Sequence, residues 1–168
     1  MFVAHLEGQG VSVIDRETGG VATVPGPGPQ FGIAAHPARR EVWVMAADSG
    51  RVSVLEAEGG RVLAVFPSGG EGPSRMGFTP DGRLAAIVHD VSNTLTLLDV
   101  ATRTPVVSIP LPAEPKVLAV SPDGRFVAVT HPEAKLVSIV DVGRRAVVRT
   151  IAVPGTPDGV AYGADRGP

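Results

Sequence analysis

The sequence predicts an all-β fold made of repeats, and two observations support this class. A short apolar segment that ends in an acidic residue occurs four times, and its acidic ends, Asp15, Glu56, Asp99 and Asp141, are 41, 43 and 42 residues apart. Short apolar runs alternate with turns rich in Pro, Gly and Asp, and no window shows helical apolar spacing with caps. The 168 residues therefore form a single domain of four repeats, at about 1–40, 41–83, 84–125 and 126–168.

Each repeat contains four predicted strands. In the set of four taken as an example, the strand Val117–Val120 is followed by the turn Ser121–Gly124, in which proline presets one turn position and glycine accepts the positive φ of another. The strands Phe126–Val129, Leu136–Val140 and Ala146–Ile151 follow. Four-stranded sheets that repeat radially form a β-propeller, so the chain is predicted to have four blades of about 42 residues.

The ends of the chain allow two arrangements of these blades. The sequence begins with what would be the second strand of a blade and ends with a first-strand segment, Gly159–Tyr162. That segment would complete the first blade and close a four-blade ring. In the alternative, an open arc exposes apolar faces at both ends and is expected to dimerise into an eight-bladed ring or to belong to a longer protein.

Composition excludes several classes of partner. Fifteen basic and 17 acidic residues give a net charge of −2 with no basic block, so neither nucleic-acid binding nor a membrane-binding basic segment is expected. No apolar run reaches the ~18 residues of a membrane span, so no membrane insertion is expected. The absence of cysteine excludes disulfides and thiolate metal sites. Because Met1 leads directly into repeat sequence without a signal peptide, the chain as written predicts a cytoplasmic protein or a fragment.

The last repeat carries a more specific pattern, formed by Phe126–His131, Leu136–Asp141, Val147–Ile151 and Pro157–Ala161. This pattern resembles the YVTN-type β-propeller repeat, and the resemblance extends over essentially the whole chain. It implies a propeller of a family that is often exported and mostly has no assigned chemistry. The family shares its blade with lactonases and with the propeller domains of haem- or copper-containing reductases, although a shared fold does not imply a shared function.

Three of the four histidines are the candidate site residues. His5, His89 and His131 each stand six residues before the marker segment, at the predicted end of a second strand, and Ala46 takes this position in the second blade. Imidazoles from several blades would suit zinc, copper, iron or nickel, or would face a haem. The alternative is that each ring hydrogen-bonds its own loop, since the related repeat has asparagine at this position. His36, which precedes Pro37, is expected to cap a turn.

The charges of the loops beside the histidines bear on the type of partner. These loops carry a net charge of −3, from Glu7, Asp48, Glu71, Asp90, Glu114, Glu133 and Asp158 against Arg51, Arg75, Lys116 and Lys135. Such a face would favour a cation or a protein with a positive patch. The acidic strand ends on the opposite face are interpreted as turn residues rather than as calcium ligands.

Three functions follow from these observations. The leading hypothesis is a non-enzymatic scaffold that binds a protein or small-molecule ligand through its loop face. The first alternative is a metal- or haem-associated oxidoreductase or electron-transfer module that uses His5, His89 and His131. A lactonase-like hydrolase is the weaker alternative. The sequence identifies no cofactor and no catalytic residue.

Overall fold

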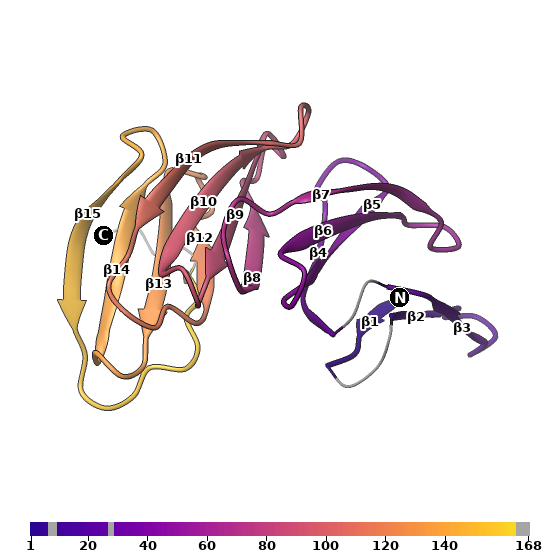
Figure 1. Ribbon diagram of the computed structural model, residues 1–168, viewed down its shortest axis with the longest axis horizontal. Coiled ribbons are helices and arrows are strands. Elements are labelled where there is room, and N and C mark those ends of the chain that lie inside the picture. The colour runs from indigo at the N-terminus through magenta and orange to yellow at the C-terminus, as the bar shows by residue number, and fades with distance from the viewer. Residues whose placement is uncertain (7–9, 27–28, 164–168) are drawn as a thin grey trace.

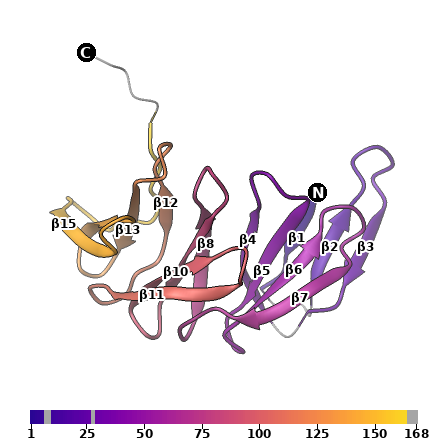
Figure 2. The ribbon, with the colours of Figure 1, turned by 90° about the horizontal axis from the view of Figure 1, so that it is seen from above.

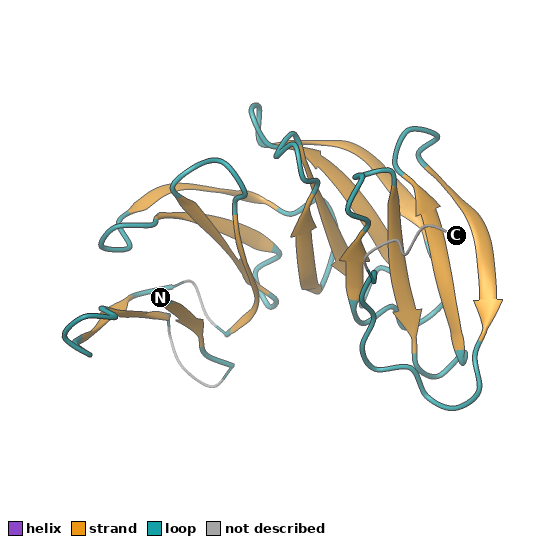
Figure 3. Ribbon diagram, turned by 180° about the vertical axis from the view of Figure 1, so that it is seen from behind, coloured by secondary structure: helices purple, strands orange, loops and turns teal. Residues whose placement is uncertain are grey.

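The fold consists entirely of antiparallel sheets that stand side by side in an open row. The computed structural model describes residues 1–6, 10–26 and 29–163, and this part of the chain contains strands and turns but no helix (Figure 3). It therefore contains no helix that could cross a membrane. Figures 1 and 2 show the row running from the N-terminal sheet at one end to the C-terminal sheet at the other. The predicted all-β class is confirmed.

Four sheets correspond to the four predicted blades. Blade 1 is a three-stranded sheet in the order β1-β2-β3, and blades 2, 3 and 4 are four-stranded sheets whose strands are neighbours in sequence order. The strands of blades 1 and 2 are β1 (Phe2–Ala4), β2 (Val11–Ile14), β3 (Val21–Val24), β4 (Gln30–Ala35), β5 (Glu41–Ala46), β6 (Arg51–Glu56) and β7 (Val62–Pro67). Those of blades 3 and 4 are β8 (Pro73–Phe78), β9 (Leu84–His89), β10 (Thr94–Asp99), β11 (Thr104–Pro110), β12 (Leu118–Val120), β13 (Phe126–His131), β14 (Leu136–Asp141) and β15 (Ala146–Ala152).

The middle blades are apolar on both faces because each packs against two neighbours. Successive residues of a strand point to opposite faces of its sheet. In β9, Ala85 and Ile87 belong to the cluster shared with blade 2, whereas Ala86 and Val88 belong to the cluster shared with blade 4. The same alternation in β5 divides its residues between blade 1 and blade 3. This two-sided burial explains the nearly continuous apolar runs of the sequence.

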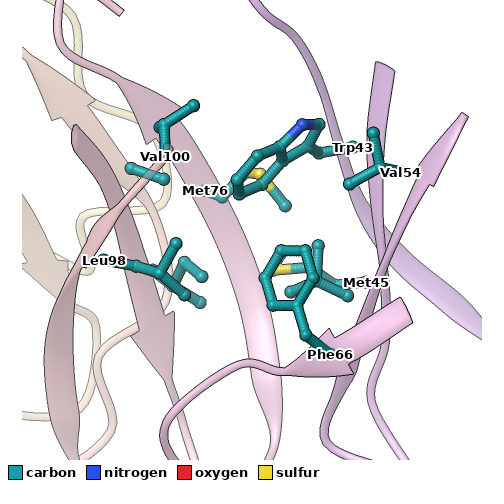
Figure 4. Packing of buried hydrophobic residues seen from close by; sticks show 10 residues of the cluster. Trp43, Met45, Val54, Phe66, Met76, Leu98 and Val100 are labelled. Carbon is teal, nitrogen blue, oxygen red and sulfur yellow. The ribbon is translucent and has the colours of Figure 1, made fainter. Parts of the chain in front are cut away.

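The cluster between blades 2 and 3 contains the largest buried side chains. Trp43 is fully buried, and its ring makes edge contacts with Phe66 and Phe78 at centroid distances of 5.2 and 5.1 Å. Figure 4 shows Trp43 and Phe66 from blade 2 facing Met76 and Leu98 from blade 3. Edge-to-face rings of this kind add about 0.5–1.5 kcal/mol to the free energy of burying their area.

The proposed closure of a four-blade ring by Gly159–Tyr162 is wrong for this structure. No strand of the described residues lies beyond β15, and blade 1 lacks its first strand. The N-terminal and C-terminal blades lie at opposite ends of the row (Figure 1), so the segment cannot reach β1 of its own chain. Packing between neighbouring sheets fixes their relative orientation, and four sheets packed in this way do not complete a circle. The open arc is the arrangement observed.

The buried tryptophan gives a direct test of the stacking between blades. We expect Trp43→Ala to lower the free energy of unfolding by about 3–5 kcal/mol, because it leaves a cavity between blades 2 and 3. The control Val62→Ala, at a position that is 44% exposed on β7, should change it by less than about 0.5 kcal/mol. Urea unfolding followed by circular dichroism measures both, and equal effects would contradict the packing described.

Candidate functional site: the histidine face

One edge of the row carries all the loops that adjoin the three candidate histidines, and we call it the histidine face. It consists of the hairpins β5–β6, β9–β10 and β13–β14, and of the described residues of the β1–β2 connection and of the loops that join successive blades. His5 follows β1, and His89 and His131 end β9 and β13, while Ala46 ends β5. The structure thus places the histidines at equivalent strand ends, as the repeat spacing predicts.

His89 lies beneath the loop that joins blades 2 and 3. Its ring is fully buried, and its Nε2 atom is 3.0 Å from the hydroxyl oxygen of Ser68. The Ser68 hydroxyl donates to the Gly70 carbonyl at 3.2 Å, so it accepts its bond from the Nε2–H of His89. A Cβ atom on Gly70 would lie 2.6 Å from the ring, which shows how closely the loop covers it. The ring therefore anchors an interblade loop.

His131 makes the corresponding contact between blades 3 and 4. It is fully buried, and its Nδ1–H donates to the carbonyl of Ala113 at 3.3 Å. Its Nε2 atom and the Ser138 hydroxyl are buried and have no hydrogen-bond partner among the described residues. The equivalent atoms of blade 1 bond directly, because Nε2 of the half-buried His5 is 2.7 Å from the Ser12 hydroxyl.

These contacts bear on the metal hypothesis for His5, His89 and His131. Each ring lies in a different blade and is bonded to its own sheet or to the adjacent loop. Over residues 1–6, 10–26 and 29–163, no group of three or more His, Asp or Glu side chains is placed to hold a metal ion. A shared metal would require the rings to leave their present partners. The hypothesis stays a prediction, and loop anchoring is the role that the contacts describe.

Burial also sets the protonation of two of these rings. Removal from water disfavours the imidazolium ion, and it lowers the pKa of His89 to about 4. The same cause lowers the pKa of His131. Both rings are therefore neutral near pH 7, the form in which one ring nitrogen donates and the other accepts.

His36 lies at the opposite edge and has the role expected of it. Its Nδ1 accepts hydrogen bonds from the backbone N–H groups of Ala38 and Arg39, at 3.1 and 2.8 Å, so it caps the turn after β4. Its Nε2–H donates to the carbonyl of Gly82 at 3.0 Å, which ties blade 2 to blade 3. The sequence predicted the cap but gave no sign of this bridge between blades.

The carboxylates of the opposite edge are also held within turns. Asp15, Asp99 and Asp141 accept bonds from backbone N–H groups two or three residues further on. Asp81 and Asp123 each accept a bond from the hydroxyl that begins their own turn. These bonds lower the pKa values of Asp15, Asp81, Asp99 and Asp123, because they stabilise the ionised form. The interpretation of the acidic strand ends as turn residues is confirmed for the three aspartates, whereas the Glu56 carboxylate pairs with the guanidinium of Arg61.

An apolar groove of about 300 Å³ lies on the histidine face between blades 2 and 3. Phe31 and Val91 are 42% and 64% exposed there, and Asp48 and Asp90 lie at the same groove. The lining comprises Pro29, Phe31, Ala47, Asp48, Gly72, Pro73, Ser74, Asp90 and Val91. Asp90 is 3.7 Å from the Lys116 ammonium, whereas no ion pair is found for Asp48 in the described part of the chain. An apolar wall with a free carboxylate suits a cationic, apolar ligand.

The sequence analysis did not single out Phe31 or Val91. A comparison of the blades contains the missing signal, because Phe31 occupies the position of Ser74 in blade 3 and of Lys116 in blade 4. Val91 is at a hairpin tip where blades 2 and 4 have Asp48 and Glu133. Phe31 and Val91 are thus exposed apolar side chains at positions that are polar in the blades compared.

The described residues keep the acidic character expected of this face. Glu7 lies outside them, and the remaining charges are Asp48, Glu71, Asp90, Glu114, Glu133 and Asp158 against Arg51, Arg75, Lys116 and Lys135. Six acids against four bases leave a net charge of −2, and only Asp90 and Lys116 pair with each other. The face has no basic groove.

Comparison with known proteins places this architecture in a family. Residues 31–168 match the YNCE-like β-propeller family, which covers most of the chain, so the chain belongs to this family. The predicted YVTN-type resemblance is thereby confirmed.

Among solved structures, the chain is similar to the hydrazine synthase of Kuenenia stuttgartiensis, with a TM-score of 0.71 and 20% sequence identity. The alignment covers 76% of this chain and 36% of the other, so the likeness concerns the propeller fold. No curated protein matches the sequence.

The depressed pKa of His89 predicts a specific loss of stability in mild acid. Between pH 6.5 and about 4 the unfolded chain binds a proton at this residue and the folded chain does not. The free energy of unfolding should therefore fall as the pH falls through this window, by up to about 3 kcal/mol from His89 alone. Urea unfolding at a series of pH values measures this slope.

His89→Gln is the matched variant, because its amide can still reach Ser68 but does not titrate. Its slope over the same window should be clearly smaller than that of the native chain, with a remainder from His131. The aspartates with lowered pKa values contribute only from about pH 5 downward, so the slope between pH 6.5 and about 5 reports on the histidines. An unchanged slope in His89→Gln would show that His89 is not the group responsible.

Proposed function

We propose that the chain is a non-enzymatic scaffold that binds a basic, apolar segment of a partner protein in the groove of the histidine face. The observation that carries this proposal is the juxtaposition of exposed Phe31 and Val91 with the unpaired carboxylate of Asp48. Aromatic and aliphatic side chains on a surface provide the desolvated centre of most protein interfaces. Carboxylates at the rim select the sign of the partner's charge.

The surroundings of the groove support a binding role over a catalytic one. The buried histidines are neutral and bonded to loops, and the aspartates of the opposite edge are held by their turns. A nucleophile needs an adjacent base that activates it, and a general base must lie within hydrogen-bond reach of the proton that it removes. The groove itself offers two carboxylates, one hydroxyl and apolar walls, which can recognise a cation beside a hydrophobic side chain.

A pair of synthetic peptides tests the proposal. One alternates leucine and proline with lysine, and its matched partner has glutamate in place of each lysine. We expect the lysine peptide to bind more tightly by at least about tenfold, and to bind more weakly as salt is raised, because exposed charges are screened over about 8 Å at physiological ionic strength. Fluorescence anisotropy of labelled peptides measures both affinities.

Equivalent positions in two blades supply the control. Asp48→Lys should weaken binding of the lysine peptide about tenfold, whereas Glu133→Lys, at the same hairpin position in blade 4, should change it less than about twofold. Phe31→Ser should also weaken binding, without a change in the circular dichroism spectrum. Equal affinities for the two peptides, or equal effects of the two charge reversals, would contradict the proposal. A stoichiometric metal lost on replacing His5, His89 and His131 by alanine would favour the redox alternative instead.

A further inference from the structure

Both ends of the row expose a sheet face of the kind that is buried between blades. The free face of blade 4 carries Val137, Ile139 and Ile151. Val137 is opposite Ile151 across β14 and β15, and Ile139 lies on the same face, two residues after Val137. In blade 3 the same repeat positions are occupied by Leu95, Leu97 and Ile109, which are buried against blade 4. The surface at this end is therefore built to receive another blade.

The N-terminal end presents the complementary surface. The free face of blade 1 carries Val3, Ser12 and Ile14. Val3 and Ile14 correspond to Ile87 and Leu98 of blade 3, which are fully buried against blade 2. Val3 is 37% exposed and Val21, beside Ile14, is 64% exposed. The free face of blade 4 thus resembles one side of an interface between neighbouring blades, and the free face of blade 1 resembles the other side.

Blade 1 lacks a first strand, and the sequence of such a strand lies at the other end of the chain. Pro157 and Gly159–Tyr162 align with Pro115 and with the residues that form β12, so Val160 corresponds to Leu118 and Ala161 to Ala119. Among the described residues this segment belongs to no sheet. Tyr162 lies near the turn of blade 4, since burial and the charge of Asp123 raise the pKa of its phenol. No strand pairing of this segment would therefore have to break before it pairs with another strand.

We propose that two copies of this chain join head to tail, so that the free face of blade 4 packs on the free face of blade 1 of the partner. The segment Gly159–Tyr162 then adds to the exposed edge of β1 in the partner and completes its first blade. Two such contacts close a ring of eight blades, in which no edge or apolar face is left open. A second copy fits better than the chain's own blade 1, which lies at the opposite end of the row (Figure 2).

The internal repeats predict the register of this added strand. In blade 4, Leu118 is opposite Val129 and Ala119 is opposite Ala128. The equivalent pairs across the dimer place Val160 opposite Val3 and Ala161 opposite Phe2 of the other copy. The loop that precedes the added strand would lie over His5, as Ser68 lies over His89 and Ala113 over His131. Dimerisation would thereby give His5 the interblade loop that the other two histidines already have.

Size exclusion with light scattering tests the proposal on the native chain and on variants of each end. The native chain should have about twice its mass of 17.2 kDa over a hundredfold range of concentration. Val3→Asp and Ile151→Asp should each be monomeric with an unchanged circular dichroism spectrum, since both side chains are 37% exposed within the single chain. Val62→Asp, on an outer strand, should remain dimeric.

Mixing the two monomeric variants separates a head-to-tail contact from a symmetric one. Each variant keeps the end that the other has lost, so the mixture should contain a dimer with one intact interface. If either variant alone stays dimeric, the contact joins like ends and the proposal is wrong. A native chain that is monomeric over the whole concentration range also overturns it.

A cysteine pair tests the register, because the chain has no cysteine of its own. Val3→Cys combined with Val160→Cys should form disulfides between two chains on oxidation, since opposed residues of paired strands have Cα atoms about 4.5–5.5 Å apart. Val91→Cys combined with Val160→Cys should remain unlinked. A disulfide within one chain would show that the four blades close on themselves and would overturn the proposal.

Discussion

Burial of apolar side chains between neighbouring sheets is the interaction on which the rest of this structure depends. Every blade is a meander whose strands pair only with their neighbours in sequence, so strand pairing holds each sheet together but does not join the sheets. Between blades 1 and 2, the Gln30 N–H also donates to the His5 carbonyl at 3.0 Å. Alternate residues of the central strands join the sheets, each buried side chain contributing roughly 1.5–3 kcal/mol of transfer free energy. Alternation explains why β5 is apolar from Val42 to Ala46, why β9 is apolar from Leu84 to Val88, and why the end blades expose valine and isoleucine.

Hydrogen bonds between blades orient the neighbouring sheets that this apolar stacking holds together. His36 joins blade 2 to a turn carbonyl of blade 3 on one edge, and His89 and His131 hold the interblade loops on the other. Most residues that resemble catalytic or metal-binding groups are therefore bonded within the scaffold. Surfaces that are not used for stacking or anchoring include the groove around Phe31 and the two ends of the row. For these surfaces we propose binding at the groove and assembly at the ends of the row.

The repeat in the sequence predicted the sheets, the strand-end position of the histidines and the turn role of the strand-end aspartates. These features are local, because a repeat of about 42 residues specifies the same hairpins in each copy. Of the two arrangements left open by the sequence, closure of the ring by Gly159–Tyr162 was wrong and the open arc is observed. Closure depends on the angle between sheets, which side-chain packing sets and periodicity does not.

The groove was missed for a related reason. It depends on Phe31 and Val91, which depart from the residues of the other blades, whereas the repeat pattern draws attention to what the blades share. A comparison of copies at each position, rather than a search for their common features, would have found both residues. The residues that recur in the blades mostly build the scaffold, whereas Phe31 and Val91, each found in a single blade, line the groove that we propose as a binding surface.

One pair of variants tests most directly the claim that stacking between sheets stabilises the fold. Leu97 and Ile139 occupy the same repeat position, but Leu97 is buried between blades 3 and 4 and Ile139 lies on the free face of blade 4. In the Val3→Asp background, which we expect to be monomeric, Leu97→Ala should lower the free energy of unfolding by about 3 kcal/mol and Ile139→Ala by less than about 1 kcal/mol. Equal losses at the two positions would mean that each sheet is stabilised by itself, and would contradict the account.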